Sequence, residues 1–508
     1  MKRYSLPVLL VLFTMYPSVD GNAAVVAVRG GLSTGVDIYD RSDKGSSTAL
    51  GEEGEAVSAL IVEEDDEDDY QRIFVRPSIA IDRSTERSSL VFSYQPTLYY
   101  DFDNEDEDVN HGASLSFRNQ MSEAWTLSVI DSVLQSDIAE DVAVTEPIAA
   151  TPESGATAPP TTAGLSESDR ISDEEGRRKY TTNTLQVLSD YTYGQGSLFS
   201  MGYAYNILRN DDAGDDDYQD FDRHQVSLSL AHRWNRLWRS SLSGQYVRGL
   251  FDEPDRDIAE TAAEIQTVDV PEEPSEDLDE YGAGMGVSYE GIVHQPLSLA
   301  YGLSASDYDD ETQNDSEIHD LTFGWRWHRS PHVTYNAGAG PSYARIDRQD
   351  DTWGYNGEIG ADYAIERGRF HIAVEKGMER QNFSGEVDEN GLIDYWDGRA
   401  DFSYQLFEST SVAVFAGYRY EDQDEVVPGS AALPPPPDAA QMLENDLVET
   451  VNSQRLYAGC SVSYSFRQKY NLNLSYRYTD QTSDDPGDEY EAHQIMLTLS
   501  YATDFWRW

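Results

Sequence analysis

Along most of the chain, apolar and polar residues alternate with a period of two. Near the C-terminal end, apolar residues occupy every second position from Leu456 to Phe466. The intervening positions from 459 to 465 are Gly459, Ser461, Ser463 and Ser465. A second run, Asn471 to Tyr478, places Leu and Tyr on one side and Asn, Ser and Arg on the other. Because successive side chains of a β-strand point to opposite faces, these runs predict a hairpin with one apolar face.

The same pattern recurs along the chain and predicts one leading strand, nine hairpins and one closing strand, about 20 strands in all. An even number returns the chain to the side on which it began, as in single-chain bacterial barrels. Eighteen strands, with one hairpin fewer, is the second choice. The predicted strands cover residues 28–40, 73–82, 87–102, 111–118, 125–134, 180–193, 197–208, 223–232, 238–249, 281–290, 297–307, 317–327, 333–345, 352–365, 370–380, 393–406, 412–420, 456–466, 471–478 and 490–503.

The first residues are typical of a secretory signal peptide. Lys2 and Arg3 precede an apolar stretch, Val8 to Phe13, and small residues at 21–24 offer a cleavage site. We therefore expect a signal peptide at 1–24 and a single domain at 25–508. No later stretch approaches the roughly 18 apolar residues of a membrane helix. Repeated hairpins in a secreted chain predict an all-β fold, a transmembrane antiparallel up-and-down β-barrel in a bacterial outer membrane.

The connections between the predicted strands fall into two classes. Those within a hairpin are short and several are basic, such as 233–236 and 467–469. Those between hairpins are mostly longer and acidic: residues 251–280 carry thirteen Asp or Glu against one Arg. Membrane barrels have short periplasmic turns and longer extracellular loops. The acidic connections are therefore expected to be extracellular, and both termini periplasmic.

Aromatic residues follow the same division. Tryptophans gather at the short turns and tyrosines toward the long connections, as expected for the two aromatic girdles at the interfaces of a membrane barrel. The tryptophans are Trp125, Trp234, Trp238, Trp325 and Trp327, and the tyrosines are Tyr94, Tyr99, Tyr100, Tyr205, Tyr418, Tyr420, Tyr476 and Tyr478.

Charge and cysteine content narrow the range of partners. The formal net charge of -57 excludes nucleic acid as a partner, because its phosphates would be repelled. Most of this charge is interpreted as a solvated surface. The one cysteine, Cys460, excludes a disulfide framework and lies on an apolar strand face, where a small hydrophobic role is expected.

If the apolar face of each strand contacts lipid, the opposite face lines the interior. Charges of both signs fall on that face, where they avoid the cost of facing lipid. They can brace the wall through cross-strand pairs or line a pore that selects hydrated or polyhydroxylated solutes. The candidate lumen-lining residues are Arg118, Asp190, Arg326, Asp362, Glu375, Asp401, Arg419 and Arg477.

The sequence carries no recognisable catalytic or cofactor motif. We find no nucleophile elbow, zinc-protease helix or P-loop. His319 beside Asp320 and His224 near Asp222 are interpreted as isolated surface pairs. Acidic runs such as 63–69 lack the spacing of a calcium loop, so diffuse Ca²⁺ binding is the most they predict. We expect no enzyme activity, no catalytic residue, no cofactor and no resident metal.

Residues 76–125 resemble the second family of β-barrel porins, outer-membrane barrels associated with exopolysaccharide production and secretion. The similarity rests on Arg76-Pro77-Ser78-Ile79, Arg87 to Leu90, Tyr94-Gln95-Pro96 and Tyr99-Tyr100, with His111 and Leu115 beyond, and on the opening Gly35 to Asp40. These motifs are structural and bring no catalytic residue. The resemblance implies a component of polysaccharide export that works with a periplasmic export protein. The large acidic connections exceed the pattern of the family.

The leading hypothesis from sequence is therefore a porin-like outer-membrane barrel involved in exopolysaccharide export. The alternatives are a general diffusion porin that favours cations and a non-conducting surface or adhesion barrel whose acidic loops bind calcium. The expected partners are outer-membrane lipid, the outer-membrane assembly machinery, a periplasmic polysaccharide export protein and a polysaccharide. The C-terminal Phe505 to Trp508 resembles the signal that the assembly machinery reads.

Overall fold

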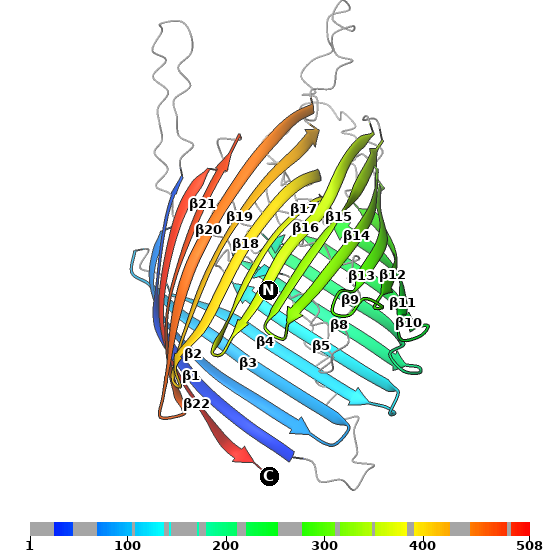
Figure 1. Ribbon diagram of the computed structural model, residues 1–508. Coiled ribbons are helices and arrows are strands. Elements are labelled where there is room, and N and C mark those ends of the chain that lie inside the picture. The colour runs from blue at the N-terminus through cyan, green and yellow to red at the C-terminus, as the bar shows by residue number, and fades with distance from the viewer. Residues whose placement is uncertain are drawn as a thin grey trace, which may run out of the picture.

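Twenty long strands form one closed sheet in the computed structural model (Figure 1). The structure describes residues 25–43, 69–103, 107–136, 142–143, 170–171, 179–210, 220–251, 277–309, 315–347, 351–383, 391–426, 448–484 and 489–507. The predicted signal peptide and most of the acidic connections lie outside these residues. The barrel strands are β1 (Val25–Asp43), β2 (Tyr70–Ser84), β3 (Ser88–Asp101), β4 (Glu107–Gln120), β5 (Trp125–Ser136), β8 (Tyr180–Thr192), β9 (Leu198–Asn210), β10 (Phe221–Arg233), β11 (Trp238–Phe251), β12 (Leu278–Tyr289), β13 (Leu297–Tyr308), β14 (Ser316–Ser330), β15 (Val333–Ile346), β16 (Thr352–Ile365), β17 (Gly368–Gln381), β18 (Gly391–Phe407), β19 (Thr410–Val426), β20 (Val448–Phe466), β21 (Tyr470–Ser483) and β22 (Tyr490–Arg507).

Each barrel strand pairs with its neighbours in the chain, and β1 pairs with β22 to close the ring. Every pairing is antiparallel, and β5 pairs with β8 because β6 (Val142–Ala143) and β7 (Arg170–Ile171) form a separate two-stranded sheet. The up-and-down barrel of 20 strands predicted from sequence is therefore confirmed, in preference to the second choice of 18.

The short turns all lie at one end of the barrel, which we call the short-turn end. The first residue of β1 and the last of β22 lie there too, as the even number of strands requires. At the turn between β20 and β21, Arg467 and Gln468 adopt left-handed backbone φ angles of 53° and 60°, which residues other than Gly rarely adopt. The other end carries the long connections and is called the long-connection end.

Several strands extend beyond their predicted boundaries at the long-connection end. β20 begins at Val448 rather than Leu456, and β19 ends at Val426 rather than Tyr420. The added residues are largely polar, so they show no apolar alternation. Backbone pairing continues the ladder there, since Glu421 to Glu425 pair in register with residues 449–453. Tyr420 also donates a side-chain hydrogen bond of 2.7 Å to Asn452 across the two strands.

Apolar side chains cover one face of the closed sheet. Leu242, Met285 and Leu474 are 58%, 57% and 48% exposed and belong to a wide band of exposed large hydrophobic residues. Exposed side chains of this kind normally mark an interaction surface, and a barrel that places them around its circumference is built to contact lipid. We call this the outer face. Among the described residues, no helix is long and apolar enough to cross a membrane.

Candidate pore lining

The register of the strands assigns every paired residue to one of two faces. Residues that lie opposite each other in register point to the same face, so Asp37, Arg72 and Asp101 share one face of β1–β3. Followed around the ring, this face is opposite to the one that carries Leu242 and Leu474. We call it the inner face. Direct contacts across the ring support this assignment, because Asn382, which follows β17, reaches Glu280 and Ser306 of β12 and β13 on this face.

The register places all the predicted lumen residues on the inner face. Four of them are exposed there: Arg118, Glu375, Asp401 and Arg477. Arg326 and Asp190 are half-buried, and Asp190 accepts a hydrogen bond of 2.5 Å from Ser200 Oγ. Whether passing solutes contact these residues stays a prediction.

Arg419 is the centre of a buried ion-pair network on β17–β20. Its guanidinium lies 2.6 Å from Glu379 Oε1, donates a second hydrogen bond to Glu421 and stacks 4.8 Å from the centre of the Tyr395 ring. The side chains of Arg419 and Glu379 are only 10% and 12% exposed. Tyr395 in turn donates a hydrogen bond of 3.2 Å to Glu375. Two of the predicted residues, Arg419 and Glu375, are thus joined in one network.

Asp362 belongs to a second cluster, nearer the short-turn end. Its carboxylate accepts hydrogen bonds from Arg369 Nη2 at 2.5 Å and pairs with His371 Nδ1 at 3.1 Å. His371 on β17 lies opposite Asp362 of β16 and Asp401 of β18 in the register, so the two predicted aspartates lie on the strands that flank β17.

Sequence reasoning missed a buried pair near the long-connection end. Arg72 Nε donates a hydrogen bond of 3.2 Å to Asp101 Oδ2, and the two side chains are 0% and 3% exposed. The Arg72 guanidinium also lies over the rings of Tyr70 and Tyr99. Tyr99 therefore belongs to the inner face rather than to the predicted outer girdle. The predicted strand began at Ile73, one residue too late to include Arg72.

Hydroxyl and amide side chains fill much of the inner face between these charges. Ser33 and Ser500 are hydrogen-bonded across the β1–β22 seam at 3.0 Å, and Ser93 and Ser114 across β3–β4 at 2.6 Å. Ser463 donates to Asn473 at 2.7 Å across β20–β21. The inner face is consequently polar along these strands.

The ends of β17 and β18 leave the wall of the barrel. Pairing between β16 and β17 stops at Gly357↔Lys376, although β16 begins at Thr352 and β17 continues to Gln381. β17 and β18 remain paired with each other as far as Gln381↔Gly391. Beyond Lys376, the outward-facing side chains of β17 therefore no longer face lipid.

Met378 shows where this segment goes. It is buried against Ile318 of β14 and Ala344 and Ile346 of β15, which are on the inner face, together with Leu392 of β18. A Cβ atom on Gly354 of β16 would lie 2.8 Å from the Met378 sulfur, so this glycine gives the side chain room. The ends of β17 and β18 therefore pack inside β14–β16.

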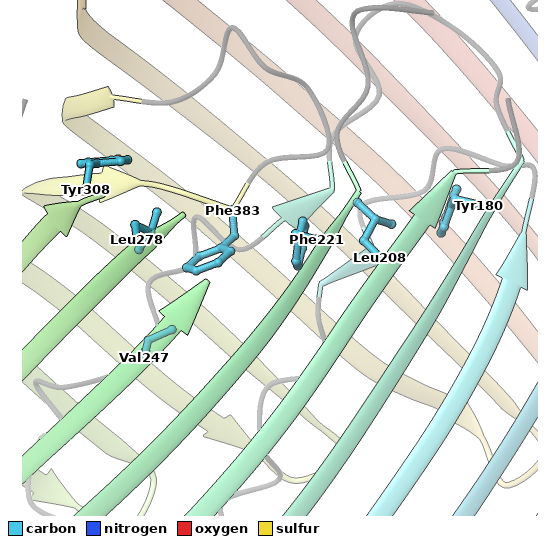
Figure 2. Packing of buried hydrophobic residues seen from close by; sticks show 7 residues of the cluster. All are labelled: Tyr180, Leu208, Phe221, Val247, Leu278, Tyr308 and Phe383. Carbon is cyan, nitrogen blue, oxygen red and sulfur yellow. The ribbon is translucent and has the colours of Figure 1, made fainter. Parts of the chain in front are cut away.

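The segment then continues across the inner face to β10–β13. Tyr308 OH donates a hydrogen bond of 2.7 Å to Asn382 Oδ1, and the Asn382 amide donates to Glu280 and Ser306. Phe383 is 2% exposed in a cluster with Phe221, Val247, Leu278 and other apolar residues (Figure 2). A Cβ atom on Gly249 would lie 2.7 Å from the Phe383 ring.

The histidine pairs singled out in the sequence are not acid–base pairs in the structure. His319 and Asp320 lie on opposite faces: Asp320 accepts hydrogen bonds from Ser342 and Asn356 inside, and His319 Nδ1 is 2.7 Å from Tyr301 OH outside. Asp222 pairs with Arg209 at 2.9 Å instead of His224. Equivalent tyrosine–histidine bonds of 3.0 Å join Tyr94 to His111, Tyr203 to His224 and Tyr476 to His493. They lie near the long-connection end, where polar tips of aromatic rings suit a membrane interface.

Within the described ranges, no group of three or more His, Cys, Asp or Glu side chains is arranged to hold a metal ion. Cys460 is exposed on the outer face, opposite Val414 and Tyr476 in the register.

Comparison with known proteins identifies no family. No protein-family model matches the sequence, and no curated protein matches it. Among solved structures, similar ones are the siderophore receptor PirA from Pseudomonas aeruginosa (10% identity, 94% of this chain, 80% of that chain, TM-score 0.45), OpdQ from the same organism (9%, 95%, 98%, 0.37) and the FrpB iron transporter from Neisseria meningitidis (10%, 96%, 82%, 0.46). Identities near 10% and TM-scores below 0.5 do not place the chain in the families of these proteins. The resemblance to the second family of β-barrel porins stays a prediction.

Proposed function

We propose that this protein is an outer-membrane barrel that conducts hydrophilic solutes through its lumen. The observation that carries the proposal is a closed ring of 20 strands with an apolar outer face and an inner face of charged and hydroxylated residues. Barrels of 16–18 strands already leave an aqueous channel. In this proposal the short-turn end faces the periplasm, together with both termini, and the acidic connections face outward.

The purified protein should conduct ions when it is reconstituted into a planar lipid bilayer. The excess of Asp and Glu in the outward connections should concentrate cations at the mouth, so the reversal potential in a KCl gradient should favour K⁺ over Cl⁻. High salt should reduce this preference, because the charges at the mouth are then screened. A folded barrel that never conducts would contradict the pore and favour the surface or adhesion alternative with calcium-binding loops.

Export of an exopolysaccharide is a narrower candidate for the same lumen. Two observations favour it: the hydroxyl-bearing inner faces of β20–β22, β1, β3 and β4, which suit polyhydroxylated solutes, and the resemblance of residues 76–125. This candidate includes a periplasmic export protein as the partner that delivers the polymer. Deletion of the gene in its native host should then abolish the extracellular polymer or trap it in the periplasm. Normal secretion by the deletion strain, measured as extracellular carbohydrate, would leave only the diffusion pore.

A further inference from the structure

The most informative feature beyond the barrel itself is the pair of strand ends that turns inward. We define the inturned end as Gly377–Gln381 of β17, Asn382, Phe383 and 391–393 of β18. Within the described chain it contacts the inner side of seven consecutive strands, from Phe221 on β10 to Gly354 on β16. A segment that covers this much of the inner wall leaves a smaller open cross-section at its level than the strand number alone would give.

We propose that the inturned end is the constriction of the pore, and that it restricts passage to small hydrophilic solutes and excludes polymers. The inference therefore favours the diffusion pore over the exopolysaccharide candidate. This inference rests on the proposed function, which it deepens by naming the solute class and the residues that set it. On the face opposite Met378, the inturned end carries Glu379, whose carboxylate lies 2.6 Å from the Arg419 guanidinium, so an ion pair also ties this segment to β19.

Two different contacts fix the inturned end in place. The first is polar: Arg380 Nε donates to Asn382 Oδ1 at 2.9 Å, and Tyr308 OH donates to the same oxygen at 2.7 Å. The Asn382 amide donates to Ser306 at 3.0 Å and to Glu280. An asparagine can make these bonds in both directions because it carries an acceptor oxygen and two donor hydrogens. Because Asn382 is only 3% exposed, its polar groups depend on these partners.

The second contact is apolar and lies next to the first in the chain. The Phe383 ring packs 5.5 Å from the rings of Phe221 and Phe251, and the Arg223 guanidinium lies 4.7 Å from its centre. Val247 and Leu278 beneath it are 0% and 1% exposed. An apolar cluster on the inner face of an aqueous pore needs such a cover, since water would otherwise contact it. Phe383 therefore anchors the inturned end against β10–β12.

The first test releases this anchor with the double substitution Asn382→Ala and Phe383→Ala. Single-channel conductance in a planar bilayer should rise by about two-fold or more, because conductance follows the open cross-section of the narrowest zone. The size limit for neutral polyethylene glycols in a liposome-swelling assay should shift upward. The heat-modifiable gel shift shows whether the variant still folds into a barrel. If it does, and its conductance and size limit are unchanged, the proposal is overturned.

An engineered disulfide between β16 and the inturned end, here called the lock, controls for indirect effects of these substitutions. The lock is the pair Gly354→Cys and Met378→Cys in a Cys460→Ser background. A Cβ on residue 354 would lie 3.8 Å from the Met378 Cγ, the position that a cysteine sulfur would take. Such proximity is compatible with a disulfide. Combined with the released anchor, this lock should restore the smaller conductance when oxidised and the larger one when reduced. A conductance that does not respond to oxidation, with the disulfide verified by mass spectrometry, would count against the inturned end as the constriction.

A third readout does not require conduction. Val247→Cys, also in the Cys460→Ser background, should react slowly with a soluble maleimide while Phe383 covers it, and much faster after the anchor is released. Ser243→Cys, on the same face of β11 but away from the cluster, should react equally in both. Equal rates at residue 247 would overturn the proposal. A wild-type barrel that is silent, beside a released variant that conducts, would overturn the passage of small solutes, because the inturned end would then close the pore completely. Silence in both would overturn the proposed pore and its constriction together.

Discussion

Replacement of Arg419 by methionine should destabilise the folded barrel by about 3–5 kcal/mol, the usual cost of removing one partner from a buried ion pair. The substitution removes the Arg419 guanidinium from the carboxylates of Glu379 and Glu421, whose side chains are only 12% and 28% exposed. The two acids then also repel each other. The free energy of unfolding should be measured by urea titration of the protein in lipid vesicles, with tryptophan fluorescence and the gel shift of the folded barrel as readouts.

Arg477→Met is the matched control, because Arg477 lies on the same inner face but is exposed. Its effect should stay within about 0.5 kcal/mol, as for most exposed substitutions. Glu379→Gln added to Arg419→Met should recover part of the loss, since one of the two carboxylates that then repel each other is neutralised. Equal stability of the Arg419 and Arg477 variants would mean that the network braces nothing and that water screens its charges.

The strand pattern was sufficient to predict the barrel but not its interior contacts. Period-two alternation determines which residues share a face, so Asp362, Asp401 and Arg477 could be assigned to one side without a structure. Alternation carries no information on which inner-face charges meet, because that depends on the stagger between strands. Glu421 is two residues from Arg419 on the same face of β19, as the alternation predicts. Glu379 lies on β17, two strands away, and no sequence spacing singles it out.

One feature of the sequence is consistent with the inturned end: two charged residues of β17 at lipid-facing positions. In β17, Lys376 and Arg380 occupy positions whose parity would point them at lipid, where a charge is costly. Lys376 instead pairs with Asp394 of β18 and lies 4.9 Å from the centre of the Tyr355 ring, at the point where β17 leaves β16. Arg248 of β11 and Asp279 of β12 have the same outward parity in strands that stay paired in the wall, so such charges are one sign of a strand that leaves the wall and not sufficient evidence for it. Where such a strand then packs depends on glycines such as Gly249 and Gly354, whose role only the fold reveals.

The assignment of outer and inner faces leads to the second large expected effect. Leu242→Arg should cost about 2–4 kcal/mol of folding free energy in lipid vesicles, the cost of an arginine on the lipid face near mid-depth. Leu242 is 58% exposed and pairs in register with Leu230 and Met285, which are also exposed and apolar, so no carboxylate stands beside it on the adjoining strands.

The neighbouring substitution Ser243→Arg separates lipid contact from a general effect of the added charge. Ser243 is the next residue of β11 and points to the inner face, where the guanidinium can remain hydrated. Its cost should be well below that of Leu242→Arg when both are measured by urea titration in vesicles of the same lipid. In detergent micelles, which deform around a charge more readily than a bilayer, the difference should shrink. If Ser243→Arg proved the more costly of the two in vesicles, the apolar band would not be the lipid-facing surface, and the pore built on the opposite face would lose its physical basis.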